Sequence, residues 1–138
     1  MDQILALMER YLGDYPGFDK KGLTASMVNN YVKMGAMPPP RKKKYTRIHL
    51  AHLVIICLLK SVLPISAIRQ MISSALAEQE EEVFYNAFCD CFEESTRDTA
   101  RAYAPAQGEN AASALCRAVL RAQAEQALAL RLATEPAE

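Results

Sequence analysis

The chain has 138 residues, of which 16 are basic and 16 are acidic, so its formal net charge is zero. At about 150 residues per domain, this length suggests one domain with room for a helical appendage. Apolar residues make up 51% of the chain and charged residues 23%, which excludes a disordered or collagen-like chain. Because there is no secretory signal, no apolar run of about 20 residues and no CxxC pair, we expect a cytoplasmic protein with reduced thiols and no membrane span.

The zero net charge hides a segregation of the two signs along the chain. Residues 1–76 hold 11 Lys/Arg and 4 Asp/Glu, a net charge of +7, and residues 77–138 hold 5 and 12, a net charge of −7. The 58 residues between Asp19 and Glu78 carry ten basic side chains and no acidic one. Such a one-signed stretch points to an anionic partner, which is a nucleic acid, a membrane surface or an acidic protein.

The spacing of apolar residues and the scarcity of glycine and proline predict an all-α, mainly helical chain. We expect a first amphipathic helix with Asp2 as N-cap and Gly13 as its stop, followed by a loop over residues 13–22. A second helix is expected from Thr24 to Met34, capped by Thr24 or Ser26 and ended by Gly35. The residues expected to face inward on these two helices are Ile4, Leu7, Met8, Tyr11, Leu12, Val28 and Tyr31.

An extended basic segment separates this pair of helices from the predicted core. Three prolines, Pro38–Pro40, force an extended backbone, and the four cations Arg41–Lys44 follow. Thr46 then caps a helix to about Ser61, which is apolar nearly all round and is expected to be the central buried element. The β-branched run Val54–Ile56 keeps a strand open as an alternative there.

Three further helices are predicted. Pro64 fits the first turn of the fourth, whose core face is Ile65, Ile68, Met71 and Ile72, while residues 76–79 are either a joint or a continuation of it. The fifth spans about Glu80–Tyr103, and one face carries Phe84, Phe88, Cys91, Phe92, Thr99 and Ala102. The last runs from an Asn110 cap to about Ala133. Because its side chains are small, with a weak stripe of Leu115, Val119, Ala122 and Ala129, it should pack tightly on the fifth helix or on a second copy of itself.

The order of helix, extended basic segment and buried helix is typical of a winged helix-turn-helix. In that arrangement a short helix reads base edges in the major groove, and the basic segment neutralises phosphates. Asn29 and Asn30 on the second helix are suited to this reading, because an asparagine amide pairs well with adenine. The sequence therefore predicts a DNA-binding surface.

The same residues resemble a known family. The stretch Ser26–Arg41 looks like the recognition helix and wing entry of MerR-type transcriptional regulators, with matches at Tyr31, Lys33, Gly35, Pro38–Pro40 and Arg41. Tyr45-Thr46, followed by Leu50, Leu53 and Ile56, looks like the wing exit and third helix, and residues 64–69 look like the start of the fourth. The LTASMVNNYVK and KKKY signatures resemble more closely an uncharacterised bacterial domain family related to MerR. The resemblance implies phosphate contacts for Tyr31, Arg41 and Lys43.

Departures from the MerR pattern keep a second function open. The family's usual arginine on the reading helix is Asn29 here, which leaves a protein-interaction module, or an RNA binder, as the alternative. We expect no enzyme activity and no cofactor, because no catalytic motif occurs. His49 and His52 share a helix face, but no nearby acid or cysteine completes a metal site, and Cys89 and Cys91 are better explained as small buried residues.

These observations define the predicted organisation. We expect a MerR-like head over residues 1–76 and a helical tail over residues 77–138. The tail is expected to form a homodimer. No residue of the sequence requires a small-molecule effector. Duplex DNA is the expected partner. The predicted DNA-binding residues are Ser26, Asn29, Asn30, Tyr31, Lys33, Arg41, Lys42, Lys43, Lys44 and Arg47.

Overall fold

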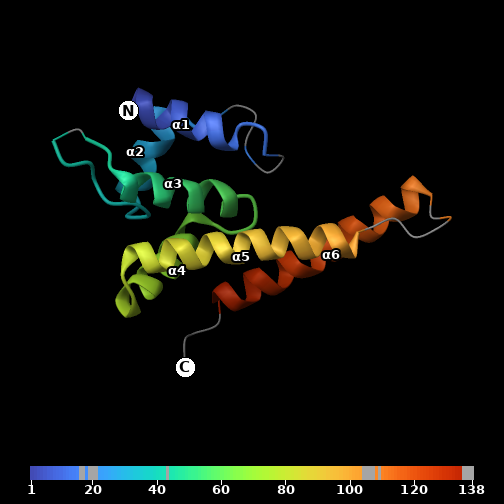
Figure 1. Cartoon of the computed structure of the whole chain (residues 1–138). Helices are drawn as coiled ribbons and strands as arrows, with labels where there is room; N and C mark the ends of the chain where they lie inside the picture. The colour runs from blue at the N-terminus through green and yellow to red at the C-terminus, as the bar shows by residue number, and fades with distance from the viewer. Residues whose placement is uncertain (16–17, 19–21, 43, 104–107, 109, 135–138) are drawn as a thin grey trace. The chain divides into compact units, whose positions relative to one another are not determined.

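The computed structural model is helical (Figure 1). It describes residues 1–15, 18, 22–42, 44–103, 108 and 110–134. Within these ranges there is no strand, only an isolated antiparallel bridge between Arg41 and Lys44. The helices are α1 (Asp2–Leu12), α2 (Ala25–Lys33), α3 (Arg47–Leu59), α4 (Ile65–Glu78), α5 (Glu81–Ala102) and α6 (Ala111–Thr134). The all-α prediction is confirmed, and the strand alternative for residues 54–56 is wrong, because they lie inside α3.

The chain divides into two units. The head unit is Met1–Glu81 and holds α1 to α4, and the tail unit is Glu82–Glu138. The sequence placed this division after Leu76, but α4 continues through that point and ends at Glu78. With 11 basic and 7 acidic residues the head unit carries +4, and with 5 and 9 the tail unit carries −4. The segregation of charge therefore follows the units, although it is smaller than for a division after Leu76.

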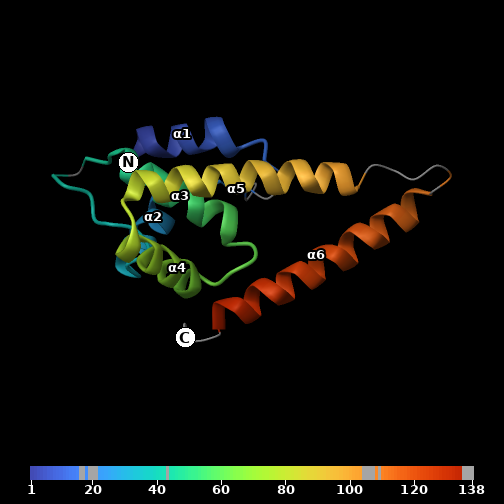
Figure 2. The same ribbon diagram turned by 60° about the horizontal axis from the view of Figure 1, so that its bottom comes forward.

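The core of the head unit is built around α3. This helix lies between α1 and α4 and contacts both (Figures 1 and 2). Burying a large aliphatic side chain contributes about 1.5–3 kcal/mol, so an apolar helix is most stable in this central position. The largest fully buried side chains are Met8, Val28, Leu53, Ile55, Ile56, Cys57 and Ile68. The expected central role of this helix is confirmed.

Both ends of α2 are closed by specific hydrogen bonds. The Thr24 side chain accepts a hydrogen bond from the Met27 amide at 3.2 Å, so Thr24, and not Ser26, is the cap. At the other end the Ala36 amide donates to the Tyr31 carbonyl, and the Gly35 amide donates to the Val32 carbonyl. This pair of bonds is a Schellman motif, and Gly35 supplies its left-handed residue with φ +71°.

Two predicted helix starts are adjusted by the structure and a third is confirmed. The N-cap of α1 is Met1, and Asp2 is the first helical residue. Pro64 is the N-cap of α4, one position before the first turn expected for it. The cap of α3 is Thr46, as predicted, and its amide donates to the His49 Nδ1 atom at 2.9 Å. Part of the expected loop over residues 13–22 lies outside the described residues.

The tail unit has no buried residue in the described parts of α5 and α6. The Asn110 side chain caps α6 by accepting from the Ser113 amide at 2.9 Å, as predicted. The guanidinium groups of Arg117 and Arg121 lie over the Tyr103 ring, 5.9 and 5.6 Å from its centroid. The sequence expects α6 to pack tightly either on the fifth helix or on a second copy of itself, and the first of these alternatives is not seen, since the larger apolar side chains of α6 are exposed. These are Leu115, Val119, Leu120, Leu128, Leu130 and Leu132.

Candidate nucleic-acid interface

One face of α2 gathers four of the predicted DNA-binding residues. Ser26, Asn29, Asn30 and Lys33 are all exposed and fall within an arc of about 100° on the helix. The opposite side of α2 is fixed in the core by buried Val28 and Tyr31. The helix is therefore held with a polar face turned outward and little freedom to rotate.

Tyr31 does not belong to this polar face. Its side chain is only 4% exposed, and its backbone carbonyl takes part in the helix stop. A phenol in that position is a core residue and offers no surface to a phosphate. The phosphate contact that the resemblance implied for Tyr31 is therefore corrected, and we leave this residue out of the candidate interface.

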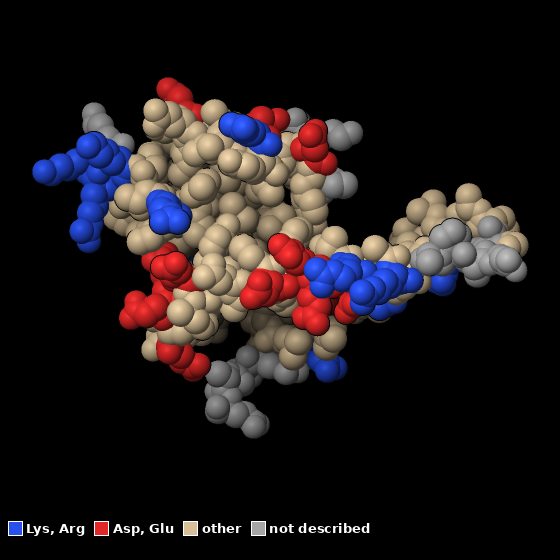
Figure 3. All heavy atoms as spheres, in the orientation of Figure 1, with Lys and Arg blue, Asp and Glu red and all other residues tan. Residues whose placement is uncertain are grey.

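The charge of the head unit is concentrated on the segment that joins α2 to α3. Figure 3 shows basic side chains gathered on the projecting turn at the left of the view. From residue 22 to residue 77 the sequence has no acid, and the described acids of the head unit lie before and after that stretch. None of the described cations of the predicted interface pairs with a described acid; these are Lys33, Arg41, Lys42, Lys44 and Arg47. Their charge is available to an external anion.

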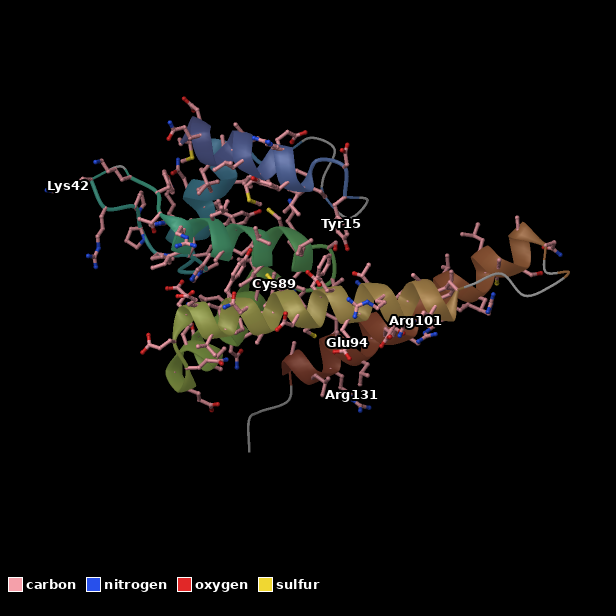
Figure 4. The ribbon with its side chains drawn as sticks, in the orientation of Figure 1. Tyr15, Lys42, Cys89, Glu94, Arg101 and Arg131 are labelled. Atoms are coloured by element: carbon pink, nitrogen blue, oxygen red, sulfur yellow. The ribbon has the colours of Figure 1, made fainter. Side chains whose placement is uncertain are left out.

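The basic turn, defined here as residues 41–44, projects from the head unit (Figure 4). The Lys44 amide donates to the Arg41 carbonyl at 2.9 Å and closes the turn. Lys42 has a left-handed backbone, with φ +49°, and its side chain points away from the helices. Lys43 lies outside the described residues. The turn is tighter than a wing built of two paired strands. Among the described residues, its strand pairing consists of the single bridge between Arg41 and Lys44.

The two ends of the basic turn are anchored in the core. On the α2 side, Ala36 and Met37 are buried, at 1% and 2% exposure. On the α3 side, His49 is buried, bonds to Thr46 through Nδ1, and packs edge-on against Tyr45 with ring centroids 5.3 Å apart. The exposed Arg47 follows directly in the first turn of α3. Cations on the turn and at the start of α3 therefore extend from a fixed base.

A hydrogen-bonded contact that sequence reasoning missed joins three segments of the head unit. His52 bonds through Nδ1 to the Ala36 carbonyl at 3.0 Å and through Nε2 to the Glu81 carboxylate at 2.7 Å. Glu81 is 29 residues away from His52 along the chain, and the sequence has no acid from residue 22 to residue 77. Sequence spacing within one helix could not have revealed this partner. His52 thereby connects the segment before the basic turn to the first residue of α5.

The histidines and cysteines are residue types that could serve as metal ligands. In the described part of the chain, no group of three His, Cys, Asp or Glu could hold a metal ion. The cysteines are also scattered: Cys57 is buried, Cys89 is half-buried, and Cys91 and Cys116 are exposed. The expectation that Cys91 is a small buried residue is wrong. Burial raises the pKa of the Cys57 thiol from 9.0 to about 11, so it stays protonated at neutral pH.

No helix in the described ranges combines the length and apolarity that crossing a membrane requires.

The structure is thus that of a helical protein in which an exposed basic turn leads directly into a buried central helix, α3. Residues 1–90 match the model of a family described as a domain of unknown function, DUF1836. The match covers most of the 138 residues, and the chain belongs to this family. It confirms the resemblance to an uncharacterised domain family, and it includes both His52 and Glu81. Neither a curated protein nor a solved structure matches the chain.

Proposed function

We propose that the head unit binds duplex DNA, with the polar face of α2 in the major groove and the basic turn on the phosphate backbone. The observation that carries this proposal is the combination of an exposed polar helix face with an adjoining acid-free basic turn in one unit. The chain then acts as a transcriptional regulator with a MerR-like winged helix-turn-helix head.

The dimensions of α2 support this assignment. An α-helix with its side chains is about 10–12 Å in diameter and the major groove is about 12 Å wide, so the helix fits into the groove, and the nine residues of α2 extend over about 14 Å. Asn29 and Asn30 present amides that suit the donor and acceptor pattern of adenine. Lys33, at the end of the same face, is suited to guanine or to a phosphate.

The basic turn supports the phosphate-binding part of the proposal. Each phosphate neutralised by a cation releases counterions, and this makes affinity fall steeply with salt. Arg41, Lys42 and Lys44 are exposed and follow one another along the turn. Arg47 adds a fourth described cation at the start of α3, and Lys43 a fifth from the sequence.

The test is the salt dependence of binding to a fluorescent duplex of mixed sequence, measured by anisotropy. The variant is Arg41→Gln/Lys42→Asn/Lys44→Gln, in which asparagine is chosen because it tolerates a left-handed backbone. We expect the log–log salt slope to become shallower by about 2 to 3, because each phosphate that is no longer neutralised removes about 0.9 from it. The matched control is Arg10→Gln, an exposed cation on α1 remote in sequence from the turn, which should leave the slope unchanged.

Two outcomes contradict the proposal. A flat salt slope in the wild type excludes phosphate binding. An Arg10→Gln effect of about one third of that of the triple variant, as expected for one charge instead of three, shows that only net charge matters. A structured RNA measured beside the duplex separates RNA binding from DNA binding. Stoichiometric capture of a protein, with no affinity for either nucleic acid, favours the interaction-module alternative.

We also propose that the tail unit forms a homodimer. The supporting observation is the exposure of Leu115 (65%) and Val119 (55%), one turn apart on the same face of α6. Large apolar side chains left in water favour association, and a second copy presents the same face under two-fold symmetry. Sedimentation across concentration tests this: Leu115→Glu/Val119→Glu should abolish the dimer, while Ala124→Glu, on the opposite side of α6, should not. A wild type that stays monomeric overturns it.

A further inference from the structure

We infer that the head unit holds a binding site for an amphipathic organic anion, an aromatic or short acyl body that bears a carboxylate, sulfonate or phosphate. The site is a cavity of about 660 Å³ between the N-terminal half of α1 and the segment that leads from the basic turn into α3. Its volume lies within the range of about 300–1,000 Å³ that is usual for small-molecule sites.

The apolar residues that line the cavity are suited to an apolar body. Ile4 and Leu7 contribute from α1, and Leu50 contributes from α3. Ile4 is buried at 5% exposure, whereas Leu7 is 38% exposed although it lies one turn along the same helix. Leu7 is thus an apolar side chain left partly in water by the chain itself, and a ligand that covers it would remove that area from water.

The charged residues that line the cavity favour a negatively charged ligand. Lys44 and Arg47 line it from the turn and from the start of α3, and no acidic residue lines it. Both cations are exposed and lack a described acidic partner. Gln3 adds a polar residue from α1 to the lining. A ligand whose head is anionic and whose body is apolar satisfies both parts of this lining, whereas an apolar cation satisfies only the apolar part and a purely polar anion only the charged part.

Two of the lining residues are also cations of the proposed DNA interface. An anion that engages Lys44 and Arg47 neutralises charge that would otherwise meet phosphate. Occupancy of the cavity is therefore expected to weaken DNA binding, a consequence that rests on the proposed function. The binding site itself does not rest on it, because the cavity and its charge belong to the head unit without DNA.

The test uses two dyes with the same aromatic body on the full chain without DNA. Anilinonaphthalene sulfonate carries a negative charge, and phenylnaphthylamine is its neutral counterpart. We expect saturable binding of the sulfonate. Lys44→Gln and Arg47→Gln should each raise the dissociation constant of the sulfonate about fivefold, which is the scale of one charge-assisted hydrogen bond. Binding of the neutral dye should change less than twofold in the same variants. Arg10→Gln, a cation on α1 outside the lining, is the matched control.

Leu7→Asp supplies a second variant that places a negative charge in the cavity at a half-exposed position, where folding is least disturbed. It should weaken the sulfonate more than the neutral dye, and helical circular dichroism should confirm that the variant is folded. Amide chemical shifts should change at residues 3–7 and 44–50. The proposal is overturned if the shifts map to α6, whose leucines could also take up the dye, or if Arg10→Gln has the same effect as Arg47→Gln.

Failure of the cavity site and failure of the proposed function give different results. If the sulfonate binds as expected and DNA does not bind, the cavity is a ligand site without a role in DNA binding. If both bind, adding the sulfonate should raise the apparent dissociation constant for DNA in the wild type. In Arg47→Gln, the sulfonate should raise the apparent dissociation constant for DNA less than in the wild type, by the same factor by which the variant weakens sulfonate binding.

Discussion

The Nε2 atom of His52 lies 2.7 Å from the Glu81 carboxylate, although the two residues are 29 positions apart. The other ring nitrogen lies 3.0 Å from the Ala36 carbonyl, which can only accept, so Nδ1 carries a proton and donates. The carboxylate is thus bound to a ring whose orientation is already set. The His52 side chain is 8% exposed and that of Glu81 29%, so water competes only partly for the interaction.

This pair of residues predicts a graded response to substitution. Glu81→Ala leaves the buried His52 Nε2 without its partner and should lower the free energy of unfolding by about 1–3 kcal/mol. Glu81→Gln retains a hydrogen-bonding side chain and should recover part of that loss. Glu80→Ala, an exposed neighbour, is the control and should have little effect. Urea denaturation of the three variants measures the differences, and equal losses in Glu81→Ala and Glu80→Ala would contradict the prediction.

Cys57 predicts a dependence of stability on alkaline pH. Burial raises the pKa of its thiol from 9.0 to about 11, and the Lys60 charge opposes this only in part. The folded-state pKa lies above the unfolded value, so the contribution to stability is complete below pH 9 and is lost as pH rises through 11. The full loss corresponds to about 2–3 kcal/mol.

The measurement compares the wild type with Cys57→Ala by urea denaturation between about pH 8 and pH 11. Groups that titrate in both proteins contribute equally to both. The difference in unfolding free energy between wild type and variant therefore reports the ionisation of the Cys57 thiol. We expect the wild type to lose its advantage over the variant as the pH increases. A gap that is constant with pH would show that ionisation of Cys57 does not affect folding.

Gly35 predicts a specific cost for any side chain at the end of α2. Its φ of +71° is left-handed, and a Cβ there would lie 3.6 Å from the Arg69 side chain, so the cost comes from the backbone and not from a clash. Gly35→Ala should destabilise the protein by about 1 kcal/mol, and Gly35→Asn by less, because asparagine tolerates this region. Thermal denaturation ranks the two, and the reverse order would contradict the helix stop described above.

The polar face of α2 predicts a separation of specificity from affinity. Once a preferred sequence has been selected from a random duplex pool, Asn29→Ala/Asn30→Ala should reduce the preference for it over unrelated DNA. The log–log salt slope should stay close to that of the wild type, because asparagine neutralises no phosphate. Ser26→Ala is the milder control on the same face. A change in slope without a change in preference would reverse the roles assigned to α2 and the basic turn.

The helical class and most helix limits could be predicted from the sequence, because they depend on local physics. The Thr24 cap, the Gly35 stop and the Asn110 cap each form a hydrogen bond or a backbone turn within a few residues. The central position of α3 also followed from its composition, since a helix that is apolar all round must be enclosed. The exposed polar face of α2 followed from the same periodicity.

Tertiary packing determines which of these residues meet. It assigns Tyr31 to the core and pairs His52 with Glu81, whose separation along the chain leaves no periodic signal. It also places α1 beside the start of α3, which creates the cavity lined by Leu7 and Arg47. Hydrophobic periodicity tells which side of a helix is buried, but it does not tell against what. The positive charge of the head unit could thus be predicted from the sequence alone. The surfaces on which that charge can act depend on how the helices pack, because packing determines which side chains remain exposed.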